Sequence, residues 1–131
     1  MFEDDFLMRQ LSRFVLGLAE SVVGQDVEEL DDLEEDVEGL LGAPVELFEA
    51  MHPTALVHFF PAGDRLAMRR ATALAIAFAR RGLERDDDAL RGRALLLLDH
   101  AAGACPELGQ EELEGLRASL RGVVDEGRGL H

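Results

Sequence analysis

The chain has 131 residues, a length that suits one domain and lets roughly two thirds of the unfolded surface become buried. Hydrophobic residues make up 47% of it, which supports a true core, although Trp and Tyr are both absent. The formal net charge of −14 argues against a nucleic-acid backbone or an anionic membrane as the main partner.

The negative charge is concentrated in the first part of the chain. Residues 1–50 hold 15 acidic residues and 2 arginines, a net of −13, whereas residues 51–131 hold 12 acidic residues and 11 arginines, a net of −1. Cys105 is the single cysteine, which fits a reducing compartment. Because no signal peptide and no apolar run approaching about 18 residues is visible, we expect no membrane span and a cytoplasmic protein.

Two helices are expected before residue 43. Apolar residues at helical spacing predict the first over residues 3–23. Asp26 opens the second, which Gly42 ends, and acidic residues occupy almost every position between its apolar stripe. This acidic face has three interpretations: a solvated helix surface, a docking face for a basic partner, or a weak cation site. For the docking interpretation the candidate residues are Glu28, Asp31, Glu35 and Glu38.

Residues 44–61 predict two short helices that cover one end of the core. Pro44 is placed to begin the first of them, and His52-Pro53 breaks the chain again. Short helices and proline breaks leave gaps that regular packing does not, so we expect an apolar groove here. Its candidate partner-binding residues are Phe48, Phe59 and Phe60.

A helical hairpin is predicted next, with arms at about 64–83 and 89–104. Asp64 is a good N-cap for the first arm, and an Asp of the acidic turn 84–88 can cap the second. Apolar residues fall at three- and four-residue steps along both arms, and Ala102 ends the buried stripe of the second. Leu95 and Leu96 make the second arm apolar nearly all round, so we expect it to be the central helix.

This hairpin resembles one tetratricopeptide repeat, over about residues 64–106. Counting from Ala75, the repeat's characteristic positions hold Phe78, Gly82, Ala94, Leu98, Ala101 and Pro106. Arg81 and Arg85 depart from the pattern, which implies a shifted packing register in the first arm. The alternative is an ordinary antiparallel helix pair that matches these repeat positions by composition alone. One unit is too few for a repeat array, so the resemblance implies a helical domain that contains a repeat-like hairpin.

The last helix is predicted over residues 110–124, with a frayed tail at 126–131. Leu113, Leu116 and Leu120 are expected to face inward, and Glu114 could pair with Arg117. Between residues 65 and 93 arginines gather into a rim. This rim is expected either to pair internally with the acidic second helix or to pair with that helix in a second copy, which would give a homodimer.

No catalytic or metal-binding motif is apparent. Glu49-x-x-His52 has the spacing of one half of a helical di-iron site, but neither His58 nor His100 has a Glu three residues before it. His100 is expected to be half-buried and bonded to a backbone group, and Cys105 to be a small buried hydrophobe or a reactive thiol. We therefore expect no enzyme, no cofactor and no metal site.

The opening Asp5-Phe6-Leu7-Met8-Arg9-Gln10-Leu11, Phe14, the acidic second helix and the hairpin together resemble a group of short bacterial helical proteins without an assigned activity. This resemblance implies a fold and no function. We predict a single all-α domain over residues 1–131, with six or seven helices. The expected function is a protein–protein interaction module or small adaptor. The alternatives are a small acidic chaperone and, less favoured, a metal-binding or redox protein.

Overall fold

The computed structural model describes residues 27–102 and, further on, residues 111, 113–118 and 120–121, with side chains from Glu34 onward. Every element in this part of the chain is a helix, so the predicted all-α class is confirmed. The helices are α2 (Val27–Leu41), α3 (Val45–Glu49), α4 (Pro53–Phe59), α5 (Arg65–Arg85) and α6 (Asp88–His100), and the described residues of 111–121 are also helical. The predictions for residues 3–23, Cys105, the tail at 126–131 and the end of the last helix lie outside the described residues.

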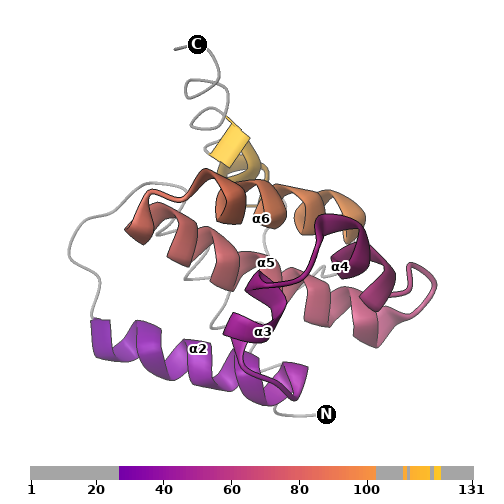
Figure 1. Cartoon of the computed structure of the whole chain (residues 1–131), viewed down its shortest axis with the longest axis horizontal. Coiled ribbons are helices and arrows are strands. Elements are labelled where there is room, and N and C mark those ends of the chain that lie inside the picture. Colours follow the sequence, from indigo (N-terminus) through magenta and orange to yellow (C-terminus); the bar gives the residue numbers. More distant parts are fainter. Residues whose placement is uncertain (1–26, 103–110, 112, 119, 122–131) are drawn as a thin grey trace.

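Helices α5 and α6 lie side by side as a hairpin, joined by a two-residue turn (Figure 1). Helices α2 and α3 pack against α5, and α4 packs against α6. Leu116 and Leu120 of the last helical segment are fully buried and Leu113 is partly buried against the same core, as predicted. The short helices α3 and α4 therefore bridge α2 and the hairpin.

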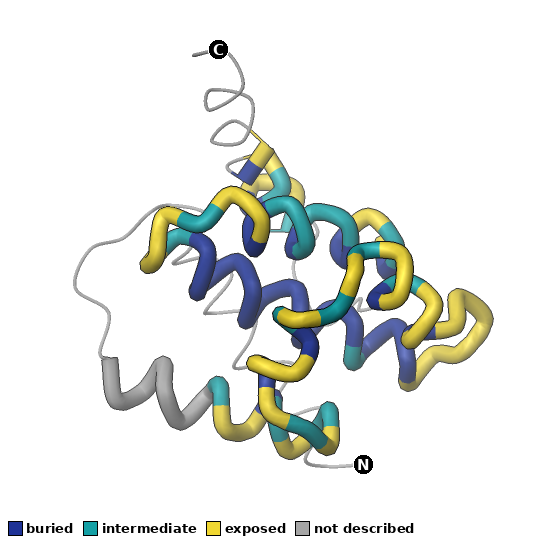
Figure 2. Tube along the Cα trace, viewed as in Figure 1, coloured by how far each residue is buried: buried dark blue, intermediate teal, exposed yellow. Residues whose placement is uncertain are grey.

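The centre of the molecule is α5, and the prediction that the second arm is central is wrong. Every residue from Ala67 to Gly82 except Arg70 is buried (Figure 2), whereas Leu95 and Leu96 of α6 keep part of their surface in water. The alanines of α5 let neighbouring helices approach on all sides, so small size decides which helix is central, more than the amount of apolar side chain. Ala102, predicted to be buried, is exposed.

The predicted helix caps of the hairpin are confirmed. The Asp64 carboxylate accepts a hydrogen bond from the Ala67 N–H at 3.1 Å, and the Asp87 carboxylate accepts from the Ala89 N–H at 2.9 Å and the Leu90 N–H at 3.2 Å. Asp86 ends α5 in the left-handed conformation, with φ of 53°. At the end of α2, Gly42 has φ of +79°, which glycine adopts without steric cost. Pro44 lies just before α3 instead of at its first position.

The hairpin closes most tightly at Gly82. A Cβ on this residue would lie 2.8 Å from Arg91 Cγ and 3.0 Å from the Arg91 backbone nitrogen. The Gly82 carbonyl accepts hydrogen bonds from the Asp87 N–H at 2.9 Å and from Arg91 Nη1 at 2.8 Å. The absence of a side chain at Gly82 therefore lets α6 start directly against the last turns of α5.

Among the described residues, none of the helices combines the length and apolar character that crossing a bilayer requires.

Candidate interaction surface

Three aromatic rings join α3 and α4, and one of them reaches the surface. Phe48 and Phe60 are 3% and 1% exposed, so they belong to the core, whereas Phe59 is 54% exposed. The Phe59 ring lies edge-on to both others, with centroids 5.4 Å from Phe48 and 5.0 Å from Phe60. Of the three predicted partner-binding aromatics, Phe59 is thus the one that a partner can reach, and its orientation is fixed by the two buried rings.

Leu47 is a second exposed apolar side chain in this region. It precedes Phe48 in α3 and is 61% exposed, the largest exposed fraction among the exposed large hydrophobic side chains of the described residues. Its neighbour Glu46 is also exposed. We give the name α2–α4 surface to five exposed side chains of the first three described helices. They are Glu35 and Asp36 of α2, Glu46 and Leu47 of α3, and Phe59 of α4; Thr54, Ala55 and His58 of α4 are exposed as well.

Beneath this surface, a buried ion cluster attaches α2 to α5. Glu34 of α2 has a side chain only 13% exposed. One carboxylate oxygen accepts from Arg80 Nη1 at 2.9 Å, and the other accepts from Arg81 Nε at 2.7 Å. Two neighbouring arginines therefore share one buried carboxylate, which confirms internal pairing between the arginine rim and the acidic helix at these positions.

The same cluster extends to α3. Arg81 donates to Glu46 at 3.0 Å and to Glu49 at 3.3 Å, and Arg85 donates to Glu49 at 2.9 Å. Burial disfavours the charged form of Arg81, but its hydrogen bonds to Glu34 and Glu46 outweigh this effect and raise its pKa. The pKa of Glu46 is lowered, first by a hydrogen bond from its own backbone and then by the bond from Arg81.

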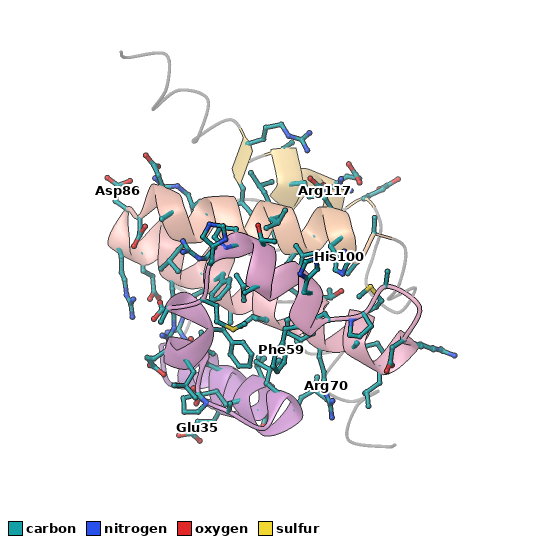
Figure 3. The ribbon with its side chains drawn as sticks, turned by 45° about the vertical axis from the view of Figure 1, so that its right-hand side comes forward. Glu35, Phe59, Arg70, Asp86, His100 and Arg117 are labelled. Atoms are coloured by element: carbon teal, nitrogen blue, oxygen red, sulfur yellow. The ribbon has the colours of Figure 1, made fainter. Side chains whose placement is uncertain are left out.

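Backbone contacts complete the attachment of α2 and α3. The Glu38 carboxylate accepts a hydrogen bond from the Val45 N–H at 2.7 Å, and this bond ties the last turn of α2 to the first turn of α3. Arg70 Nε donates to the Leu40 carbonyl, one of the unpaired carbonyls at the end of α2, at 3.0 Å. Figure 3 labels Arg70 beside Phe59, near this end of α2. The acidic helix is therefore held at both its Glu34 turn and its C-terminal end.

The acidic residues predicted to dock a partner have different surroundings. Glu35 is exposed on α2 (Figure 3) and forms no ion pair with another described residue, whereas Glu38 is partly buried and serves as the cap described above. Glu28 and Asp31 lie in α2, and their side chains are outside the described set. Asp36, which was not among the candidates, is exposed beside Glu35.

Two of the described histidines, His52 and His100, have structural contacts, whereas His58 is exposed on α4. His100 Nε2 lies 2.7 Å from the Phe60 carbonyl, so its ring joins α6 to the end of α4, as predicted for a half-buried histidine bonded to the backbone (Figure 3). His52 Nδ1 accepts from the Thr54 N–H at 3.1 Å and caps α4. Glu49, which has the spacing of a di-iron ligand relative to His52, forms ion pairs with Arg81 and Arg85. Within the part of the chain that the structure describes, no three His, Cys, Asp or Glu residues are grouped to hold a metal ion.

Two features of the site were not found in the sequence. Leu47 fits the apolar pattern of residues 44–61, but a five-residue helix has too few turns for its periodicity to show which apolar residue faces water. The pairing of Glu34 with Arg80 and Arg81 joins residues 46 and 47 positions apart. The charge signs made pairing expected, but the choice of Glu34 from a run of acidic residues depends on where α2 crosses α5.

No family model, curated protein or solved structure matches the chain. The resemblance of the α5–α6 hairpin to a tetratricopeptide repeat stays a prediction.

Proposed function

We propose that this protein is a protein–protein interaction module of the cytoplasm that binds its partner through the α2–α4 surface. The observation that supports this proposal most strongly is the exposed Phe59 ring, fixed edge-on against two buried rings. An aromatic side chain already held in one orientation loses little conformational freedom on binding, so more of its contact energy appears as affinity. Large aromatic side chains are also enriched among the residues that dominate interface energies.

The size of the surface favours a folded partner or a short motif over a long unfolded segment. Its exposed large apolar side chains, Leu47 and Phe59, come from helices of five and seven residues. A chaperone that covers an extended chain needs a longer apolar track than these two positions supply. The adaptor interpretation is therefore preferred to the chaperone interpretation.

Affinity capture from the native cells tests this function. The tagged chain is compared with Phe59→Ser, which removes the exposed ring, and with Phe59→Leu, which keeps an apolar side chain at the same place. We expect a stoichiometric partner that is retained by Phe59→Leu and lost or strongly reduced with Phe59→Ser, while circular dichroism shows both variants folded. Equal recovery of every associated protein by the two folded variants would contradict a binding role for this surface.

A further inference from the structure

We infer that the segment received by the α2–α4 surface is a basic amphipathic helix of a partner protein. This inference rests on the proposed function and adds the chemistry of the partner. It follows from the negative charges on the same helices as Leu47 and Phe59. Some of these carboxylates are paired with arginines of the protein itself, and others are not.

The stretch that builds this surface contains acidic residues and no Lys or Arg. Residues 27–64 hold eleven Asp or Glu residues and two histidines, His52 and His58, and the next arginine in the chain is Arg65. Among the described residues, Arg70, Arg80, Arg81, Arg85 and Arg93 of the hairpin bond Glu34, Glu46, Glu49 or a backbone carbonyl of this stretch. None of these bonds reaches Glu35 or Asp36.

Glu35 and Asp36 carry negative charge at the surface of α2. Both are exposed, and neither forms an ion pair with another described residue. The Glu46 carboxylate is bonded by Arg81 but remains 61% exposed, so a second cation can still approach it. Glu35 lies on α2 and Phe59 on α4, the helices that precede and follow α3, and both side chains are exposed, so the α2–α4 surface contains acidic and apolar groups (Figure 3).

A partner that covers this face must provide apolar anchors and positive charge together. An amphipathic helix with Leu-like residues at i, i+3 and i+4 and Lys or Arg beside them has both features. Nucleic acid and anionic membranes carry the wrong sign of charge. Because the carboxylates are exposed, their attraction should accelerate association and weaken as salt screens it, whereas the apolar contact should persist.

Two synthetic peptides of about 16 residues, long enough to form a helix on binding, provide the probes. Both have leucines at the same positions, and their polar positions are all Lys in one and all Glu in the other. Binding to the full-length chain is followed by fluorescence anisotropy at low and at high salt. The first variant is Glu35→Lys with Asp36→Lys. Its control, Glu111→Lys with Glu114→Lys, changes the net charge equally at exposed positions in the last helical segment, where Glu114 accepts a hydrogen bond from Arg117 at 2.6 Å as the sequence predicts.

We expect the Lys peptide to bind and the Glu peptide not to bind. The α2 double variant and Phe59→Ser should each weaken Lys-peptide binding about tenfold or more, and the control about twofold at most. Phe59→Leu should retain most of the affinity. Equal weakening by the two double variants would show a response to net charge alone and would overturn the inference, as would equal binding of the two peptides or binding of neither.

The same variants separate this inference from the proposed function. If cellular capture requires Phe59 but is unchanged by the α2 double variant, the interaction role stands and the basic partner is wrong. If capture requires neither, both proposals fail. If light scattering shows a dimer that Phe59→Ser dissociates, and the Lys peptide does not compete with it, the surface receives a second copy of the chain and the inference is overturned.

Discussion

At the scale of single residues, Gly82 sets the distance between the two central helices. A Cβ there would lie 3.0 Å from the Arg91 backbone nitrogen and 3.3 Å from the Asp87 carbonyl oxygen, atoms that cannot turn away as a side chain can. We expect Gly82→Ala to lower the free energy of unfolding by about 1–3 kcal/mol, because α6 must shift to admit one carbon. Urea denaturation of the two proteins measures this difference.

Gly92 provides the control within the same hairpin. It lies in α6, and a Cβ there would meet nothing within 4 Å. Gly92→Ala should therefore raise the free energy of unfolding by about 0.5–1 kcal/mol, the ordinary gain of helix propensity. If both substitutions stabilise the protein, the close approach at Gly82 is not required for the fold.

Sequence reasoning was most successful for residues whose role is local. Asp64 and Asp87 cap helices because a short carboxylate reaches an N–H two or three residues ahead, and this geometry depends only on the chain nearby. It was least successful for Phe48 and Phe60. Their burial depends on α3 and α4 packing together, and three Phe residues in one short stretch do not show which of them faces water.

At the scale of elements, the largely buried carboxylate of Glu34 attaches α2 to α5. Removing Glu34 by Glu34→Ala leaves Arg80 and Arg81 buried without their shared partner. The expected loss is roughly 3 kcal/mol, the lower part of the range for a broken buried pair, because Glu84, Glu46 and Glu49 still bond the two arginines. Glu35→Ala, one position along the same helix but exposed, should change stability by about 0.5 kcal/mol or less. Similar losses from both would show that Glu34 does not hold α2.

The stability contributed by Glu46, through the bond from its own backbone and then the bond from Arg81 of α5, should depend on pH. Because the pKa of Glu46 in the folded protein is below its ordinary value of 4.5, the folded state holds fewer protons than the unfolded state in this range. The stability from Glu46 is therefore fully present above about pH 4.5, and it is lost as the pH falls through the lowered pKa. We expect a small effect, since Glu46 is 61% exposed.

The test compares urea midpoints of the parent and Glu46→Gln from pH 6 down to pH 3. The two curves should converge as the pH falls, because protonation of Glu46 removes from the parent the carboxylate charge that Glu46→Gln has already removed. Curves that stay parallel over this range would mean that Glu46 does not contribute to acid sensitivity.

The order and limits of the helices could be predicted because helix caps and breaks depend on residues close together in the sequence. Gly42 follows the end of α2, and Pro44, His52 and Pro53 divide the next stretch into α3 and α4. The identity of the central helix could not be predicted in this way. The Leu-rich arm has the higher apolar content, but Ala-rich α5 admits neighbours more closely, and burial follows from how many elements pack around a helix.

At the scale of the whole molecule, several arginines of the described residues are buried while carboxylates of α2 are exposed. The net charge is −14, yet Arg69, Arg80, Arg81 and Arg91 are all less than 9% exposed, whereas Glu35 and Asp36 face water. Like charges crowded on one helix repel each other and lower its stability. The exposed carboxylates of α2 therefore oppose folding slightly, which is typical of residues retained for binding instead of for structure.

This arrangement predicts opposite effects of one substitution on stability and on binding. Glu35→Lys with Asp36→Lys places two cations among the remaining carboxylates of α2, so at low salt it should raise the free energy of unfolding by about 0.5–1 kcal/mol. Because these charges are exposed, the gain should shrink in high salt, where the repulsion in the parent is already screened. Urea denaturation at two salt concentrations measures both the gain in stability and its decrease at high salt. The same variant is expected to lose the Lys peptide, so its weaker binding could not be attributed to unfolding. If the variant is instead less stable than the parent at low salt, these carboxylates support the fold, and their exposure would no longer argue for a partner.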